Sequence, residues 1–300
     1  MVDLTSISTE QRNPNTMNLD SMDPLHVVQA MNREDRHVAE AVGEVLPAVA
    51  EAVEAARTAL LNGGRIVYLG AGTSGRLGVL DAVECPPTFG VSPGVVVGLI
   101  AGGEKAFVHA VEGAEDDPAL GARDLDAINV TDRDLVVGLA ASGRTPYVLG
   151  ALGRAKELGC TTVAIDCSPG APIAAVADIA IEPEPGPEVL TGSTRLKAGT
   201  AQKMVLNMIS TGAMVGVGKA YENLMVDVQQ TNEKLNSRAL RIVCEACSCD
   251  ANQALEALEA AGHEVKTAVV MVLTGVDAQT ARKRLDKAAG HVRGAISQAS

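Results

Sequence analysis

The strongest constraint on the fold is a series of five short apolar runs that alternate with segments of helical periodicity. The runs are RIVYLG, GVVVGLIAG, DLVVGLA, CTTVAID and ADIAIEP, and all lie between residues 65 and 183. Uninterrupted apolar runs of this length, separated by helices, are typical of parallel strands that are buried on both faces. The sequence therefore predicts a doubly wound α/β domain, a parallel sheet flanked by helices, with ligands beyond the carboxyl ends of its strands.

Helical patterns flank these runs on both sides. Apolar residues recur at helical spacing from Leu25 to Leu61, and Pro47 should either kink one long helix or open a second. A further helical pattern covers residues 198–219. Residues 1–236 are thus expected to form the α/β domain with an N-terminal helical segment.

The remaining residues, 237–300, predict a small helical bundle. Asp250 is a candidate cap for a helix that ends at Gly262, and a second helix should end at Gly275. Asp277 is a candidate cap for a third helix that ends near Gly290, and a short fourth helix follows. Packing or dimer contact is the favoured role for this bundle.

Composition and charge exclude several classes of partner. The chain has a net charge of −12 and only three Tyr, two Phe and no Trp, which disfavours nucleic acid as a ligand. No run approaches eighteen consecutive apolar residues, and the first residues lack a basic segment followed by an apolar core. We therefore expect a soluble protein of the cytoplasm that does not bind membranes.

The six cysteines are expected to be thiols. Three of them, Cys244, Cys247 and Cys249, form the cluster CEACSC. A zinc site would need a fourth ligand, and the nearest histidine in sequence, His263, falls in a helical pattern. Small buried thiols on a helix are the favoured interpretation, and no metal is predicted.

The glycine-rich turn that follows the first run has the form of a nucleotide-binding loop but lacks its other elements. Gly70, Gly72 and Gly75 match G-x-G-x-x-G after a strand. A dinucleotide site expects an acidic residue about twenty positions later, and residues 92–103 contain none. A P-loop requires Lys and Ser or Thr where Arg76 and Leu77 stand. Both nucleotide interpretations are disfavoured, and no cofactor is predicted.

A similar turn follows the third run and points to a different ligand. Both turns contain Ser-Gly-Arg, with Thr73 and Ser74 in the first and Ser142, Gly143, Arg144 and Thr145 in the second. Hydroxyl groups and free backbone N–H groups at a helix N-terminus favour phosphate.

A third hydroxyl-rich cluster, LTGSTRLKAGT, supplies Ser193 and Lys197 just before the last long helix of the α/β domain. Any one of these Ser or Thr residues alone could simply cap its helix. Three hydroxyl-rich helix starts on one sheet favour a phosphorylated, hydroxylated small molecule.

Two carboxylates are candidates for acid and base catalysis. Glu84 lies where Pro86 and Pro87 are expected to stop the helix after the glycine turn, and Glu115 lies in a loop after the second strand. Two glutamates in different environments can divide acid and base roles without a metal. His109 falls in a helical pattern nearby, where a core or surface role is favoured.

Several long segments resemble the bacterial N-acetylmuramic acid 6-phosphate etherases, which belong to the sugar isomerase (SIS) fold superfamily. The resemblance covers nearly the whole chain and includes the N-terminal TEQRNPNTMNLD. Val83 departs from the family pattern, which has a small polar residue before the glutamate. The segments that carry the resemblance are LGAGTSGRLGVLDAVECPPTFG, VEGAEDD, LAASGRTPYV, GPEVLTGSTRLKAGTAQKMVLNMISTGAMV and NLMVDVQQTNEKL.

The resemblance implies the SIS fold, a UBA-like C-terminal domain, a homodimer and a reaction. A member of this family cleaves the C3 lactyl ether of N-acetylmuramic acid 6-phosphate by elimination and water addition, and yields N-acetylglucosamine 6-phosphate and D-lactate. Ring opening exposes an aldehyde that acidifies the C2 proton. Glu115 is then expected to remove this proton, and Glu84 to protonate the departing lactyl oxygen.

The binding residues follow from the same resemblance. Ser142 to Thr145 are expected to hold the phosphate, with Thr73 and Ser74 close to the sugar or sharing the phosphate. Glu188 resembles an acid/base position of related isomerases, although a charged turn residue is an equal alternative. Lys197 or backbone N–H groups are expected to stabilise the enolate.

Two alternatives stay open. A sugar phosphate isomerase of the same fold also begins with C2 proton abstraction. A non-catalytic sugar phosphate sensor is the second alternative, and the presence of both Glu84 and Glu115 argues against it.

Overall fold

The computed structural model describes residues 7–109, 111–228 and 233–297. The chain divides into two compact units. The first comprises Met1–Val83 and Gly94–Ser210, and the second comprises Glu84–Pro93 and Thr211–Ser300.

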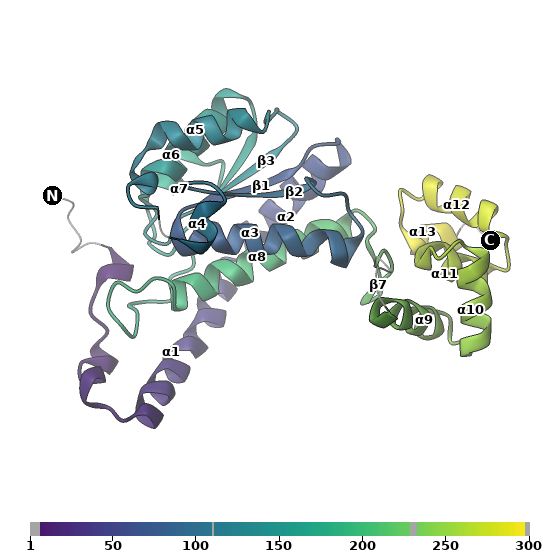
Figure 1. Ribbon diagram of the computed structural model, residues 1–300, viewed down its shortest axis with the longest axis horizontal. Helices are drawn as coiled ribbons and strands as arrows, with labels where there is room; N and C mark the ends of the chain where they lie inside the picture. The colour runs from purple at the N-terminus through teal and green to yellow at the C-terminus, as the bar shows by residue number, and fades with distance from the viewer. Residues whose placement is uncertain (1–6, 110, 229–232, 298–300) are drawn as a thin grey trace. The chain divides into compact units, whose positions relative to one another are not determined.

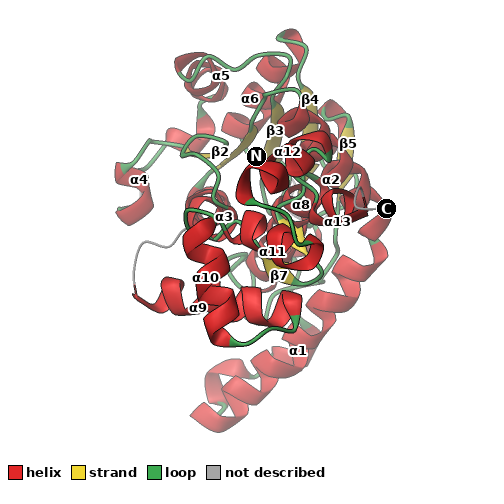
Figure 2. Ribbon diagram, turned by 90° about the vertical axis from the view of Figure 1, so that its right-hand side faces the viewer, coloured by secondary structure: helices red, strands yellow, loops and turns green. Residues whose placement is uncertain are grey.

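The first unit is built on a five-stranded sheet within the described residues, and all neighbouring strands are parallel. The strand order is β2-β1-β3-β4-β5, so the five apolar runs form the predicted doubly wound sheet. In Figure 2 the strands β3, β4 and β5 lie next to one another. The strands are β1 Ile66–Gly70, β2 Val96–Ile100, β3 Leu135–Leu139, β4 Thr161–Ile165 and β5 Ile179–Ile181.

Helices cover both faces of this sheet (Figure 1). On one face, Val67 and Leu69 of β1 and Val136 of β3 belong to a core cluster with α6. On the opposite face, a Cβ at Gly78 of α3 would lie 3.0 Å from Cβ of Tyr68. The alternation of side chains along each strand thus gives each face its own core. The helices are α5 Pro118–Ala127, α6 Pro146–Glu157 and α7 Pro172–Val176 on the first face, with α2 Leu46–Leu61, α3 Gly72–Phe89 and α8 Lys197–Gly216 on the other.

The N-terminal part of the first unit is helical, as predicted. Helix α1 spans Pro24–Glu44 and begins at a cap, in which Asp23 accepts a hydrogen bond of 3.0 Å from the His26 N–H. Helix α2 follows directly, with Pro47 in its first turn. Pro47 therefore opens a second helix rather than kinking one long helix. Before α1 lie the short 3-10 helices η1 Ser8–Glu10, η2 Pro14–Thr16 and η3 Leu19–Ser21.

One helix boundary predicted from the sequence was wrong. Pro86 and Pro87 do not stop α3, which continues to Phe89. Proline lacks an N–H and so removes two bonds of the helix ladder, but its fixed φ is itself helical. Burial of Cys85 and Phe89 on the last turns favours the continued helix, and the N–H of Gly90, at φ +63°, closes the turn on the Pro86 carbonyl at 2.9 Å.

The second unit holds a small helical bundle with its own core, as predicted. Residues such as Val226, Val243, Val269 and Leu285 pack in one buried cluster. The predicted caps are confirmed, because Asp250 accepts a hydrogen bond from the Gln253 N–H and Asp277 from the Thr280 N–H. The elements are β6 Ala220–Tyr221, β7 Leu224–Met225, α9 Glu233–Cys247, α10 Ala251–Ala260, α11 Val265–Thr274, α12 Ala278–Lys287 and α13 Val292–Ser297. Part of the motif NLMVDVQQTNEKL, residues 229–232, lies outside the described residues.

Within the ranges that the structure describes, no helix combines the length and the apolar character needed to cross a bilayer.

Candidate active site

The order of the strands fixes where a ligand can bind in the first unit. From β1 the chain crosses to β2 on one side, and it then returns to β3 on the other side. The carboxyl ends of β1 and β3 are neighbours, since Gly70 pairs with Leu139. Such a switch in strand order opens a crevice beyond the strand ends, which is the usual binding position in this class of sheet.

The glycine turn after β1 leads directly into α3. Its glycines allow close backbone approach, because a Cβ at Gly75 would lie 2.5 Å from the Gly70 carbonyl oxygen. Thr73 is half-buried in the first turn of α3. Ser74 is buried, and its Oγ donates a hydrogen bond of 2.8 Å to Oε1 of Gln202 in α8. Ser74 therefore joins the starts of α3 and α8.

The second Ser-Gly-Arg turn lies after β3 and leads into α6. Gly143 has φ +67°, and a Cβ there would lie 2.2 Å from the Ala171 Cβ, so only glycine fits. Thr145 occupies the cap position of α6 without a capping side-chain hydrogen bond. Ser142 and Thr145 are half-buried, and Arg144 is exposed. The Thr145 hydroxyl is thus not used as the cap of α6.

A buried carboxyl group that sequence reasoning missed lies behind this second turn. Asp166 follows β4 directly and is fully buried, and its Cγ would lie 3.2 Å from a Cβ at Gly143. Oδ1 accepts the Ser168 N–H at 3.0 Å, whereas Oδ2 has no hydrogen-bond partner among the described residues. Burial raises the pKa of Asp166 to about 7, against the lowering effect of the Ser168 N–H.

The third hydroxyl-rich segment leads into α8, where Ser193 is half-buried. Glu188 is fully buried, and its two oxygens accept the N–H groups of Lys197 at 2.9 Å and Ala198 at 3.0 Å. Glu188 therefore caps α8 and is not an exposed turn residue. Burial raises its pKa, while these two N–H groups and Lys197 lower it.

The Lys197 side chain is committed to a buried ion pair. Its Nζ lies 2.9 Å from Oε2 of Glu34 in α1, and both side chains are at least nine-tenths buried. Asn13 and Asn15 also donate to the Glu34 carboxylate, at 2.7 and 2.9 Å. Lys197 and the two asparagines lower the pKa of Glu34 to about 2, although burial opposes them. Glu34 carried no signal in the sequence beyond its place in a helical pattern.

The three segments meet at one edge of the sheet. The Thr73 Cγ2 would lie 3.5 Å from a Cβ at Gly199, so the starts of α3 and α8 are in contact. The Cys167 thiol, one residue after Asp166, lies 3.8 Å from the Ala198 carbonyl oxygen. The starts of α3 and α8 are therefore in contact, and the turn before α6 lies beside Asp166, whose neighbour Cys167 contacts α8.

A hollow of about 220 Å³ lies beside the glycine turn and contains one of the two candidate carboxylates. Glu115 is exposed on the short helix η4 Ala114–Asp116, which packs against α6, the helix of the second turn. The lining residues are Ala71, Gly72, Arg76, Ala101, Ala106, Val111, Glu112, Gly113 and Glu115. Glu115 and the glycine turn thus face one space at the switch point.

Arg76 supplies the cation of this hollow. Its Nε donates to the Phe107 carbonyl at 2.9 Å, and Nη2 donates to the Ala106 carbonyl at 2.8 Å. These bonds tie α3 to helix α4, Lys105–Val108. Glu112 is the second carboxylate of the lining, and sequence reasoning did not single it out.

Glu84 is exposed on α3, twelve residues after Gly72, and is not among the residues that line this hollow. At 1.5 Å per residue, twelve residues of helix correspond to about 18 Å. Leu80 and Val83 are also exposed, 46% and 58%, and Leu80 lies one turn before Glu84 on the same side of α3.

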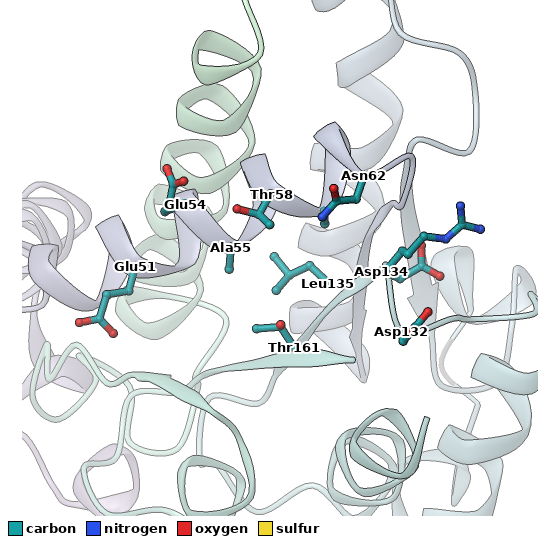
Figure 3. Close-up of a pocket in the computed structure, with 11 residues that line it drawn as sticks. Glu51, Glu54, Ala55, Thr58, Asn62, Asp132, Asp134, Leu135 and Thr161 are labelled. Carbon is teal, nitrogen blue, oxygen red and sulfur yellow. The ribbon is translucent and has the colours of Figure 1, made fainter. Parts of the chain in front are cut away.

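A larger hollow, of about 610 Å³, lies at the opposite edge of the sheet (Figure 3). It lies between α2, with Glu51, Glu54 and Thr58, and the first residues of β3 and β4, Leu135 and Thr161. This is the amino edge of the strands, away from the switch point, so we do not assign the substrate to it.

The other candidate ligating residues do not contribute to the hollow. His109 is exposed at the end of α4, and Cys244, Cys247 and Cys249 are free thiols in the second unit. Burial raises the pKa of Cys247 to about 12. Among the residues that the structure describes, no three His, Cys, Asp or Glu side chains are arranged to hold a metal ion.

Comparison with known proteins gives matches over nearly the whole chain. A family model described as the glucokinase regulatory protein N-terminal SIS domain matches residues 48–156, and a SIS domain model matches residues 115–211. The N-acetylmuramic acid 6-phosphate etherase of Serratia proteamaculans is 60% identical, over 99% of this chain and 100% of that protein. The etherase of Enterobacter sp. is 61% identical, over 98% of this chain and 99% of that protein.

Among solved structures, the phosphoheptose isomerase of Francisella tularensis is 16% identical, with a TM-score of 0.49, and covers 65% of this chain and 100% of that one.

Proposed function

This chain belongs to the N-acetylmuramic acid 6-phosphate etherase family and is an enzyme, and we propose that the hollow beside its glycine turn is where the reaction takes place. The reaction cleaves the C3 lactyl ether of N-acetylmuramic acid 6-phosphate and gives N-acetylglucosamine 6-phosphate and D-lactate. The observation that carries the site assignment is that the Glu115 carboxylate and the glycine turn line one hollow at the switch point.

Glu115 acts as the base in the first chemical step. An ether is a poor leaving group, so the sugar ring first opens to an aldehyde that makes the C2 proton acidic. Glu115 removes this proton, and backbone N–H groups of the glycine turn stabilise the enolate that forms. Loss of the C3 oxygen gives an unsaturated aldehyde, to which water then adds.

Glu84 acts as the acid that protonates the departing lactyl oxygen, and we propose that a homodimer completes the site. Support comes from α3, where Glu84 lies about three helical turns beyond Gly72, one turn after the exposed Leu80 and next to the exposed Val83. Neighbouring exposed apolar side chains on one helix favour a surface that a partner covers, whereas single ones do not. A second copy over this face would bring its own hollow to Glu84.

The phosphate binds at the start of α6. Ser142, Arg144 and Thr145 offer hydroxyl and guanidinium groups there, and Gly143, at φ +67°, allows the tight turn into the helix. Thr73 and Ser193 lie at the neighbouring starts of α3 and α8 and contribute hydroxyl groups. Ser74, Glu188 and Lys197 contribute through the contacts that hold these helix starts in place.

We further propose a cytoplasmic enzyme that acts in amino sugar recycling or catabolism. The net charge of −12 and the small number of aromatic residues favour a small-molecule substrate over nucleic acid.

The experiment that tests this function is D-lactate release from N-acetylmuramic acid 6-phosphate in the presence of EDTA, with the wild type beside Glu84→Ala. Lactate from the wild type alone is the expected result. A Glu84→Gln variant should still exchange the C2 proton with solvent, because the base precedes the acid. Sugar phosphate binding without lactate release from the wild type would contradict the proposal and favour an isomerase or a sensor.

A further inference from the structure

The hollow beside the glycine turn has an unusual charge balance for a site that takes an acid. Glu112 and Glu115 place two carboxylates in its lining, and Arg76 is the one basic residue among the nine described residues that form it. The substrate of the proposed function brings a third carboxylate, because its C3 substituent is a lactyl group. Like charges at close range destabilise a complex unless a cation compensates them.

The lactyl carboxylate must also lie near Glu115. It is separated from the C3 oxygen by a single carbon, and C3 is bonded to C2, from which Glu115 takes the proton. A sugar whose C2 lies at Glu115 therefore has its lactyl carboxylate only a few bonds from that point. This carboxylate lies in the same hollow or at its edge. Arg76 shares that hollow with Glu115.

The Arg76 guanidinium is held in a fixed orientation. Nε and Nη2 donate to the carbonyl oxygens of Phe107 and Ala106 at 2.9 and 2.8 Å. A guanidinium has five N–H donors, so these two bonds leave donors at the Nη1 and Nη2 end of the group. That end presents two parallel N–H bonds, which match the two oxygens of a carboxylate. Because the side chain is already oriented, little rotamer entropy is lost when a ligand binds.

Resting on the proposed function, we infer that Arg76 forms a subsite for the lactyl carboxylate and selects muramic acid phosphates over sugar phosphates that lack this group. The second Ser-Gly-Arg turn then serves the other end of the substrate. Arg144 binds the phosphate and Arg76 binds the carboxylate, so the two similar turns bind the two anionic groups of one molecule.

The test compares two ligands on two arginine variants. N-acetylmuramic acid 6-phosphate carries both anionic groups, whereas N-acetylglucosamine 6-phosphate carries only the phosphate. Arg76→Gln should raise KM for the first by about 10- to 100-fold, the usual range for a lost charged hydrogen-bond pair, and leave Kd for the second within about twofold. Arg76→Lys should give an intermediate KM, because lysine keeps the positive charge but lacks the two parallel N–H donors of the guanidinium.

The matched control is Arg144→Gln, in the other Ser-Gly-Arg turn. It should weaken the binding of both ligands by a similar factor, because both carry the phosphate. The thermal midpoint of each variant is measured beside these constants, since Arg76 also holds α4.

Two results would overturn the inference. If Arg76→Gln or Arg76→Lys weakened both ligands equally, the role of Arg76 would be structural, and if neither variant changed KM, the carboxylate would bind elsewhere. Either outcome is distinct from failure of the proposed function, in which the wild type itself releases no lactate.

Discussion

At the scale of single residues, Asp166 shows how this fold removes a carboxyl group from water and so disfavours its charged form. It is fully buried behind the Ser142–Thr145 turn, and one of its oxygens has no hydrogen-bond partner among the described residues. Burial, together with the nearby charge of Glu182, raises its pKa to about 7. The protonated form is therefore the stable one in the folded protein at mildly acid pH.

We predict that Asp166→Asn stabilises the protein at pH 8. The folded state binds this proton more tightly than the unfolded state, so wild-type stability falls as pH rises from about 4 to about 7. The amide is neutral and keeps the oxygen that accepts the Ser168 N–H. The free-energy difference should grow through that window to on the order of 2–4 kcal/mol and stay constant above it. Urea unfolding at pH 4, 6 and 8 measures it.

The control for this prediction is Asp132→Asn, at an exposed position in the same unit. Its effect should be near zero at all three pH values. A constant offset between Asp166→Asn and the wild type, without pH dependence, would contradict the assignment of the raised pKa.

The two glutamates of the hollow allow a second prediction. Glu115→Gln should lower kcat by about 10²–10⁴-fold, the usual contribution of a general base, and abolish C2 proton exchange. Glu112→Gln keeps the same shape in the same lining and should lower kcat by less than about tenfold. Exchange of deuterium from solvent into the sugar, followed by NMR, separates proton removal from ether cleavage. Equal losses in the two variants would argue against Glu115 as the base.

At the scale of elements, the buried pair of Lys197 and Glu34 fixes α1 to the start of α8. The pair spans 163 residues of sequence, and Asn13 and Asn15 complete the hydrogen bonds of the carboxylate. The same contacts position the segment that carries Ser193. The low pKa of Glu34 means that its stabilising effect is complete above about pH 4.5 and is lost as pH falls toward 2.

We predict that Lys197→Met destabilises the fold by about 3–5 kcal/mol, because it leaves the Glu34 carboxylate buried without its cation. The double variant Glu34→Gln with Lys197→Met should be more stable than Lys197→Met alone. A double-mutant cycle by urea unfolding at pH 7 measures the coupling. Additive effects of the two substitutions would show that the pair is not coupled.

Elements whose signals lie within a few residues could be predicted from the sequence, whereas a boundary that depends on burial in the folded structure could not. The strands and the C-terminal helices were predicted because periodicity and caps such as Asp250 and Asp277 act within a few residues. The end of α3 was wrong, because burial of Phe89 outweighs the local cost of Pro86 and Pro87.

The same reason applies to the candidate site. The glycine turn and Glu115 could be predicted, because strand ends and loops locate them. The contacts Ser74–Gln202 and Glu34–Lys197 join residues 128 and 163 positions apart and leave no local pattern in a single sequence. Asp166 was missed because an acid at a strand end resembles any surface carboxylate until its burial is known.

At the scale of the whole molecule, the helical bundle includes more of the chain than residues 237–300. Val226 and Val228 belong to its buried cluster, and Lys266 of α11 lies 2.7 Å from Asp227. A chain cut after residue 236 would therefore expose both valines and remove a partner of Asp227. We predict that this truncated chain aggregates, which light scattering at equal concentrations of the full and truncated chains measures. A monodisperse truncated chain would support 237–300 as an independent domain.

The exposed face of α3 carries the last prediction. If a second copy covers Leu80, Val83 and Glu84, the protein in solution has a mass of about 62 kDa, twice the 30.8 kDa of one chain. Replacing Leu80 and Val83 together by Glu places charges in that interface and should give a monomer. Leu61→Glu, at an exposed leucine on α2, should leave the dimer intact. Because the dimer supplies the acid, the monomeric variant should bind sugar phosphate and release no lactate, and light scattering with a lactate assay on the same samples tests both. A variant that is monomeric and fully active would show that a single chain contains the whole site.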